Sequence, residues 1–193
     1  MERKGATARR EGWMLTADAF GEIDRGSVRA KRTDGGWGVA LREPSLAWGW
    51  CVTLPERFRT GIYWLTAARV LYTQGDVAAG ISLHSRGRGL LFRVNAHRGI
   101  AELCTLSVRN ETVCAGALRI SGIPWPAEVV LEYNALTERC AGSLGSRKLF
   151  DIPLPWRGVK PLEAPDAVEV VTTSGEESGP AAAFYGHLRL DGA

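Results

Sequence analysis

One long stretch of the chain reads Ile62-Tyr63-Trp64-Leu65-Thr66-Ala67-Ala68-Arg69-Val70-Leu71-Tyr72. It is rich in β-branched and aromatic residues, and it lies between Gly61 and the turn-forming residues Thr73-Gln74-Gly75-Asp76. An apolar run of this composition with turn residues at both ends predicts a β-strand.

Shorter segments of the same kind follow one another along the whole chain, with Gly, Pro, Asn or Asp between them. They cover residues 13–20, 23–32, 37–42, 46–54, 77–84, 90–95, 100–108, 112–120, 128–134, 140–144, 148–152, 167–173 and 183–190. Residues 127–139 could instead form a helix, but the run Val129-Val130-Leu131 favours strand, turn and strand. This series predicts an all-β protein, a sandwich of two antiparallel sheets.

Composition and charge limit the classes of protein that this chain can be. The chain has 193 residues, of which 45% are hydrophobic and 23% charged, as in an ordinary globular domain. We expect a flexible basic lead-in at residues 1–12 and a single domain at 13–193. The net charge of +3 is too small to predict a nucleic-acid partner.

The sequence also bears on membranes and location. No apolar run reaches the roughly 18 residues that span a bilayer, and the first residues lack the apolar segment of a signal peptide. We therefore expect no membrane association. We favour the cytoplasm, unless the chain is a domain excised from a longer secreted protein.

The four cysteines are Cys51, Cys104, Cys114 and Cys140, and no two of them form a Cys-x-x-Cys pair. This spacing excludes the common zinc-knuckle and thioredoxin motifs. Cys104 and Cys114 flank the turn at residues 108–110 and could face each other across a hairpin, where an oxidising compartment would allow a disulfide. We favour buried free thiols over that alternative.

Three segments resemble a known family. Residues 127–155 contain Glu128-Val129-Val130-Leu131-Glu132-Tyr133-Asn134, a turn, and two further short strands joined at Gly145. This passage resembles the concanavalin A-like lectin and glucanase domains, including laminin-G-like modules. Phe184-Tyr185-Gly186-His187-Leu188-Arg189-Leu190 resembles the strand that closes those sandwiches, and Trp48–Leu54 their long inner strand. The resemblance implies a concanavalin A-like jelly roll, a fold used for carbohydrate or protein recognition.

The catalytic pattern of the related glucanases is absent from the sequence. That pattern is Glu-x-Asp-x-(x)-Glu on one strand, whereas here Glu22-Ile23-Asp24 is followed by Arg25, Gly26 and Ser27. Acidic residues that could bind calcium are isolated on turns. The three histidines are far apart in the sequence. We therefore predict no catalytic residue, no metal and no cofactor, although carboxylates from different strands could still meet on one sheet.

Aromatic and basic residues are the candidates for ligand binding. Trp48, Trp50 and Trp64 lie inside predicted strands and are expected in the core. The side chains predicted to contact a ligand are loop tryptophans for stacking and arginines for polar or anionic groups: Trp37, Trp125 and Trp156, with Arg86, Arg88 and Arg93.

Our hypothesis from the sequence is a non-catalytic, lectin-like carbohydrate-binding module. The alternative is a structural or protein-interaction sandwich within a larger assembly. A glycoside hydrolase with another arrangement of carboxylates comes third. The sequence carries no indication of oligomeric state.

Overall fold

The structure is a computed structural model that describes residues 13–16, 21–86, 88–107, 112–154, 162, 164–176 and 179–192. The predicted lead-in at residues 1–12 lies outside these residues, so the proposed domain boundary stays a prediction. None of the helical segments in the described ranges is long and apolar enough to cross a membrane.

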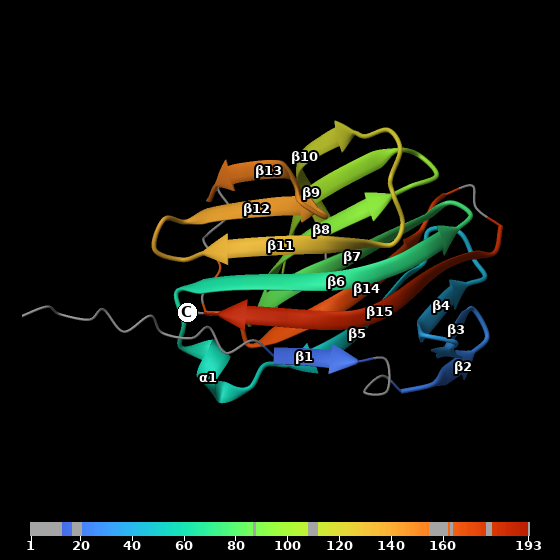
Figure 1. The fold of residues 1–193 in the computed structure, drawn as a ribbon, viewed down its shortest axis with the longest axis horizontal. Helices are drawn as coiled ribbons and strands as arrows, with labels where there is room; N and C mark the ends of the chain where they lie inside the picture. The colour runs from blue at the N-terminus through green and yellow to red at the C-terminus, as the bar shows by residue number, and fades with distance from the viewer. Residues whose placement is uncertain are drawn as a thin grey trace, which may run out of the picture.

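Two antiparallel sheets make up the described fold (Figure 1). The nine-stranded sheet runs in the order β13 (Arg147–Pro153), β12 (Arg139–Leu144), β11 (Ala127–Asn134), β6 (Tyr63–Gln74), β15 (Ala181–Gly192), β4 (Gly36–Leu41), β3 (Val28–Thr33) and β2 (Ile23–Arg25), with β1 (Trp13–Thr16) on β15. The six-stranded sheet runs β10 (Thr112–Arg119), β9 (Ile100–Leu106), β8 (Arg88–Asn95), β7 (Val77–Ser85), β14 (Ala167–Ser174) and β5 (Ala47–Thr53). The predicted two-sheet antiparallel sandwich is confirmed.

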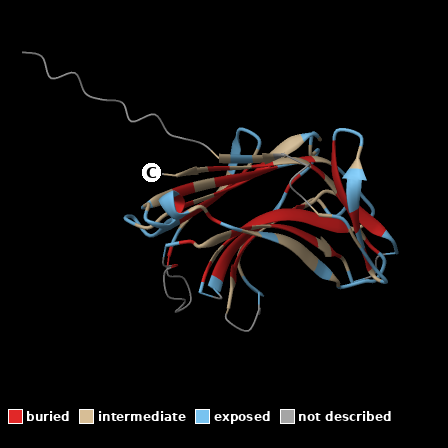
Figure 2. Ribbon diagram, turned by 90° about the horizontal axis from the view of Figure 1, so that it is seen from below, coloured by how far each residue is buried: buried red, intermediate tan, exposed pale blue. Residues whose placement is uncertain are grey.

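The core lies between the two sheets because alternate residues of each strand point inward. Trp64 of β6 and Phe92 of β8 are fully buried there. In the burial view the buried residues follow the strands of both layers (Figure 2). Trp48 and Trp50, on β5, pack against this core as expected.

Two segments, at residues 127–139 and 23–32, decide between the alternatives that the sequence offered or depart from what it predicted. Residues 127–139 form strand, turn and strand, as β11 and the start of β12, so the helical alternative is wrong. The single strand expected at 23–32 is instead two strands, β2 and β3, joined at Gly26. Gly26 has a φ of +46°, a left-handed conformation that reverses the chain. One short helix, α1 (Glu56–Arg59), occupies the loop that precedes β6.

The six-stranded sheet is bent, and its hollow side faces away from the other sheet (Figure 2). We call this outer surface of β5, β7, β8, β9, β10 and β14 the hollow face. Ser82, Leu91 and Cys104 point toward it because their strand neighbours point into the core. They are nevertheless 0%, 3% and 0% exposed. These three outward side chains on the floor of the hollow face are thus covered by their neighbours.

At one edge of this sheet, β9 and β10 form the expected hairpin. Cys104 lies directly opposite Cys114 in the ladder. The next pair is Gly116 with Leu103, so Ala115 is an extra residue that forms a β-bulge.

Candidate functional site

The hollow face presents neighbouring rows of outward side chains that cross the sheet strand by strand. One row contains Thr173, Ala78, Asn95 and Ile100, and the next contains Val171, Gly80, Arg93 and Glu102. A third row contains Glu169, Ser82, Leu91, Cys104 and Cys114. The strand register therefore brings together polar and apolar groups that are far apart in the sequence.

The middle of the face has an apolar floor. Leu91, Cys104 and Val171 form a buried cluster separate from the main core, with Leu106 and Cys114 packed against it. Gly80 lies between Val171 and Arg93 in its row. A Cβ atom there would come within 2.6 Å of the Phe92 carbonyl oxygen. The floor thus depends on a residue without a side chain at that position.

A cavity of about 410 Å³ opens at one end of the hollow face. Its lining combines residues of β7, β8, β9 and β14 with the segments around Ser45 and Gly175. Among them, Arg93 Nε donates to Glu102 Oε2 at 2.7 Å. These two side chains are 23% and 28% exposed, so water screens their ion pair only in part.

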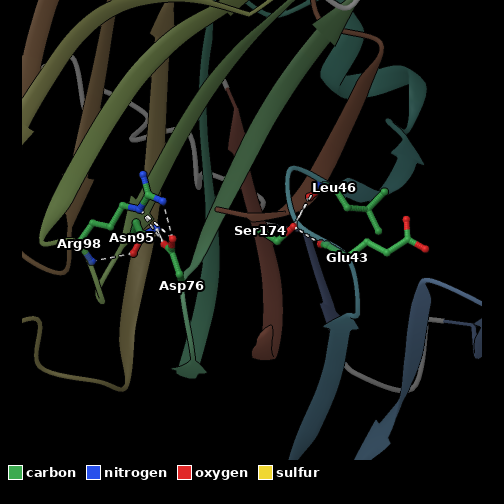
Figure 3. Close-up of polar contacts among 6 residues, drawn as sticks. All are labelled: Glu43, Leu46, Asp76, Asn95, Arg98 and Ser174. Carbon is green, nitrogen blue, oxygen red and sulfur yellow. Dashed lines mark hydrogen bonds and ion pairs between the residues drawn. The ribbon is translucent and has the colours of Figure 1, made fainter. Parts of the chain in front are cut away.

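A second ion pair stands beside this cavity and is held on several sides (Figure 3). Arg98 Nη2 donates to Asp76 Oδ2 at 2.6 Å, and Asn95 Nδ2 donates to Asp76 Oδ1 at 2.7 Å. The hydrogen bond from Arg98 is the largest cause of a lowered pKa for the Asp76 carboxyl, and burial opposes it. A Cβ at Gly175 would lie 1.9 Å from Asp76 Oδ2, so glycine makes room for the pair.

Ser174 connects the end of β14 to the segment before β5 (Figure 3). Its Oγ donates to the Glu43 carbonyl oxygen at 2.7 Å and accepts from the Leu46 backbone N–H at 2.9 Å. Ser45 N–H also donates to the Gly175 carbonyl oxygen at 3.0 Å. These bonds hold the rim of the cavity at Ser45 and Gly175 in place.

Another polar cluster lies farther along the hollow face. His84 Nε2 contacts Ser82 Oγ at 2.6 Å and Glu169 Oε2 at 2.9 Å. Both partners use the same ring nitrogen, whereas a nucleophilic triad needs the acid on one nitrogen and the hydroxyl on the other. This cluster therefore lacks the geometry of a Ser-His-acid relay. Across the strand pair, burial and then the charges of Glu169 and Asp166 raise the pKa of the Cys51 thiol.

The carboxylates of Glu102 and Glu169 lie too far apart on the hollow face to form a hydrolytic pair. Glu102 is on β9 and Glu169 on β14, with β8 and β7 between them. Three strand spacings amount to about 14 Å. Glycoside hydrolysis requires about 5–5.5 Å for retention or about 6.5–9.5 Å for inversion. Glu169 also extends over Gly49 of β5, away from Glu102. Among the described residues, no group of three His, Cys, Asp or Glu side chains could hold a metal.

The predicted ligand contacts do not gather at one place. Trp37 is 0% exposed on β4, where it packs against Trp48, Trp50 and Tyr185. Its prediction as a stacking residue is wrong, because the strand begins directly after the turn and this position alternates into the core. Trp125 is half-buried against the core in the connection from β10 to β11.

The other predicted contacts lie elsewhere. Trp156 falls outside the described residues. Arg86 and Arg88 are exposed at the turn from β7 to β8. Arg93 is five residues beyond Arg88 along β8, about 17 Å away, and it alone lines the end cavity. A further cavity of about 520 Å³ lies at the β10–β11 connection, lined in part by Ile123, Pro124 and Pro126 beside Trp125.

Sequence reasoning did not select Asp76, Asn95, Glu102 or Ser174. The alternation in 90–95 and 100–106 gives a signal for Asn95 and Glu102, since it places them on the same face as Arg93. Ser174 and Glu43 are 131 residues apart, and nothing in the sequence indicates that they meet.

Neither a protein-family profile nor a curated protein sequence matches this chain. Solved structures do. A β-1,3-1,4-glucanase (lichenase) derived from a mouse hindgut metagenome has a TM-score of 0.62 at 8% identity, over 94% of this chain and 99% of the other. The Crh5 transglycosylase in complex with NAG has a TM-score of 0.64 at 7% identity, over 94% and 84%.

A third similar structure is SCLam, a non-specific endo-β-1,3(4)-glucanase from family GH16. Its TM-score is 0.55 at 9% identity, over 93% of this chain and 89% of the other. The fold is a concanavalin A-like jelly roll. At such low identity, this likeness shows the jelly-roll architecture alone. The chemistry of the protein depends on the residues of its hollow face.

Proposed function

We propose that this jelly roll binds a neutral oligosaccharide on its hollow face without cleaving it. The observation that carries the proposal is the cavity of about 410 Å³, whose lining combines the Arg93–Glu102 ion pair and Arg98 with the apolar side chains of Ala78 and Ile100. A sugar ring has one less polar face and a rim of hydroxyl groups. Binding sites that combine apolar surface with a few placed polar groups suit such a ligand.

Arg93 and Glu102 are the side chains that we assign to the sugar hydroxyls. Arg93 uses Nε for Glu102, and among the described residues its other two guanidinium nitrogens have no partner. Glu102 likewise uses Oε2, which leaves Oε1 as an acceptor. A donor and an acceptor side by side can hold two neighbouring hydroxyl groups.

The charges of the cavity favour a neutral ligand over an anionic one. Each arginine at the cavity has a carboxylate partner, and Glu176 adds a further carboxylate to the lining. An anionic sugar would compete with these carboxylates and meet repulsion from Glu176. This changes the expectation from the sequence, in which the arginines were assigned to polar or anionic groups.

Two further observations support binding without cleavage. The separation of Glu102 and Glu169 is too large for glycoside hydrolysis. The similar solved structures include glucanases and a complex with NAG, which supports carbohydrate as the ligand class. The alternative of a protein-interaction module would call for a largely apolar hollow face, whereas this one has ion pairs at its end.

A glycan-array screen followed by calorimetry tests the proposal. The probes are mixed-linkage β-1,3-1,4-glucan oligosaccharides, laminaritetraose and N-acetylglucosamine oligomers. We expect Arg93→Gln and Glu102→Gln to weaken binding about tenfold or more, because each leaves a hydrogen-bonding partner unmatched. The matched control is Arg139→Gln, which removes an ion pair from the other sheet and should leave affinity unchanged.

Three results would contradict the proposal. They are a blank array from folded protein, equal weakening by Arg139→Gln, and release of reducing sugar from any probe. Trp125→Ala and Trp156→Ala in the same assay test the predicted stacking residues. Loss of binding in Trp125→Ala alone would move the site to the β10–β11 connection.

A further inference from the structure

Two cysteines of the hollow face lie in position to form a covalent bond. Cys104 and Cys114 are direct partners across the antiparallel β9–β10 ladder. Such partners have Cα atoms about 4.5 or 5.5 Å apart, within the range of about 4.4–6.8 Å found for disulfides. Cys114 also packs against the buried cluster that contains Cys104.

The two thiols differ in access. Cys104 is 0% exposed and belongs to the apolar floor. Cys114 is half-buried, and its Sγ donates to the Gly116 carbonyl oxygen at 3.3 Å. An external reagent can therefore reach Cys114 first, and Cys104 lies beside it on the neighbouring strand.

The remaining cysteines cannot compete for this bond. Cys51 is on β5, at the opposite edge of the six-stranded sheet. Cys140 is buried in the other sheet, where it pairs with Tyr133 on the inward side. Each would need movement of whole strands to reach Cys104 or Cys114.

We propose that Cys104 and Cys114 form a reversible redox site, oxidised to a disulfide by exchange with a small disulfide such as glutathione disulfide. The Cys114 thiolate attacks glutathione disulfide, one glutathione leaves as a thiolate, and a mixed disulfide remains on Cys114. The Cys104 thiolate then attacks Cys114 Sγ and releases the second glutathione. The protein loses two protons and two electrons, and glutathione disulfide gains both.

The second step limits the reaction near neutral pH. Burial, and next the neighbouring Cys114, raise the pKa of the Cys104 thiol to about 12. The fraction of thiolate at Cys104 is therefore small, and it grows about tenfold for each pH unit gained below that value. Closure of the disulfide should therefore accelerate as the pH rises.

The test exposes the folded full-length chain to glutathione disulfide at several pH values from about 7 to about 9. Acid quenching, alkylation in denaturant and peptide mapping then follow. We expect one product, a Cys104–Cys114 cross-linked peptide, with Cys140 alkylated as a free thiol. Dithiothreitol should restore the starting state. Cys51→Ser is the control and should leave the cross-link intact.

Variants at the pair separate this site from general reactivity. Cys104→Ala, which keeps the buried position apolar, should trap the glutathione adduct on Cys114. Cys114→Ser should give no cross-link and no adduct at Cys104. The proposal is overturned if Cys104 stays alkylatable after prolonged treatment at about pH 9, with or without glutathione on Cys114. It is also overturned if Cys51 supplies the cross-link. These results do not depend on carbohydrate binding.

Discussion

The outer faces of the two sheets follow the same alternation of side chains and differ in shape. On the hollow face, the Arg93–Glu102 ion pair is 23% and 28% exposed. On the outer face of the nine-stranded sheet, the Arg139–Asp151 pair is 46% and 44% exposed. The two ion pairs therefore differ in their access to water: Arg139–Asp151 lies on β12 and β13 at the edge of its sheet, whereas Arg93–Glu102 lies on the inner strands β8 and β9 of the hollow face. A binding site needs such partly dry polar groups, which the hollow face supplies.

The largest expected effect on stability comes from adding a side chain at Gly80, on the floor of the hollow face. A Cβ at Gly80 would lie 2.6 Å from the Phe92 carbonyl oxygen and 2.7 Å from Arg93 Cβ. Neither neighbour is the end of a flexible side chain, so strands β7 and β8 must separate. We expect Gly80→Ala to lower the free energy of unfolding by about 2–3 kcal/mol in urea denaturation.

Gly179→Ala is the matched control for that substitution. Gly179 is exposed, and a Cβ there would meet no atom within 4 Å. We expect a change of less than about 0.5 kcal/mol. Equal losses in the two variants would show that crowding on the hollow face is not the cause.

A smaller effect is expected when the coupling energies of the two ion pairs are compared directly. Double-mutant cycles of Arg93 with Glu102 and of Arg139 with Asp151, each to Gln or Asn, measure the coupling within each pair. We expect about 1–2 kcal/mol for the hollow face and about 0.2–0.5 kcal/mol for the other sheet, because water screens the more exposed pair. Equal couplings would contradict the role given to the exposure of the two pairs.

The smallest expected effect is on the stability of the folded protein at acid pH. Hydrogen bonding from Arg98 is the main cause that lowers the pKa of Asp76 in the folded protein. A depressed pKa stabilises the fold above the ordinary value of about 3.9, and that contribution is lost as the pH falls through the folded value. As the pH falls below about 4, Asp76→Asn should therefore lose less of its folding stability than the unsubstituted protein does. The difference should be less than about 1 kcal/mol. Parallel acid curves for both proteins would contradict this prediction.

Much of the fold could be predicted from the sequence, since strand composition and turns are local properties. The hairpin that carries Cys104 and Cys114 follows from two strands about one short turn, and the structure pairs the two residues directly, which the sequence had left open. The break at Gly26 was missed because 23–32 reads as one apolar-polar series. The left-handed glycine that reverses it has no distinctive neighbours.

The site could be predicted only in part. Arg93 was identified, but its partner Glu102 and the network around Asp76 depend on strand register. Trp37 shows the limit most clearly. The turn before it was recognised, whereas the face of the strand that it occupies depends on the sheet packed against it. Contacts such as Ser174 with Glu43 join distant segments and require the full topology.

The extra residue at Ala115 has a consequence for the solubility of the protein. β10 is an edge strand, and it exposes Val113 and Leu118 at 37% and 38%. A regular edge of this kind invites another chain to add a strand, which leads to fibrous aggregates. The bulge interrupts the ladder between Cys114 and Gly116, so an incoming strand would find no continuous register. The bulge at Ala115 thus disfavours the addition of a strand from another chain at this edge.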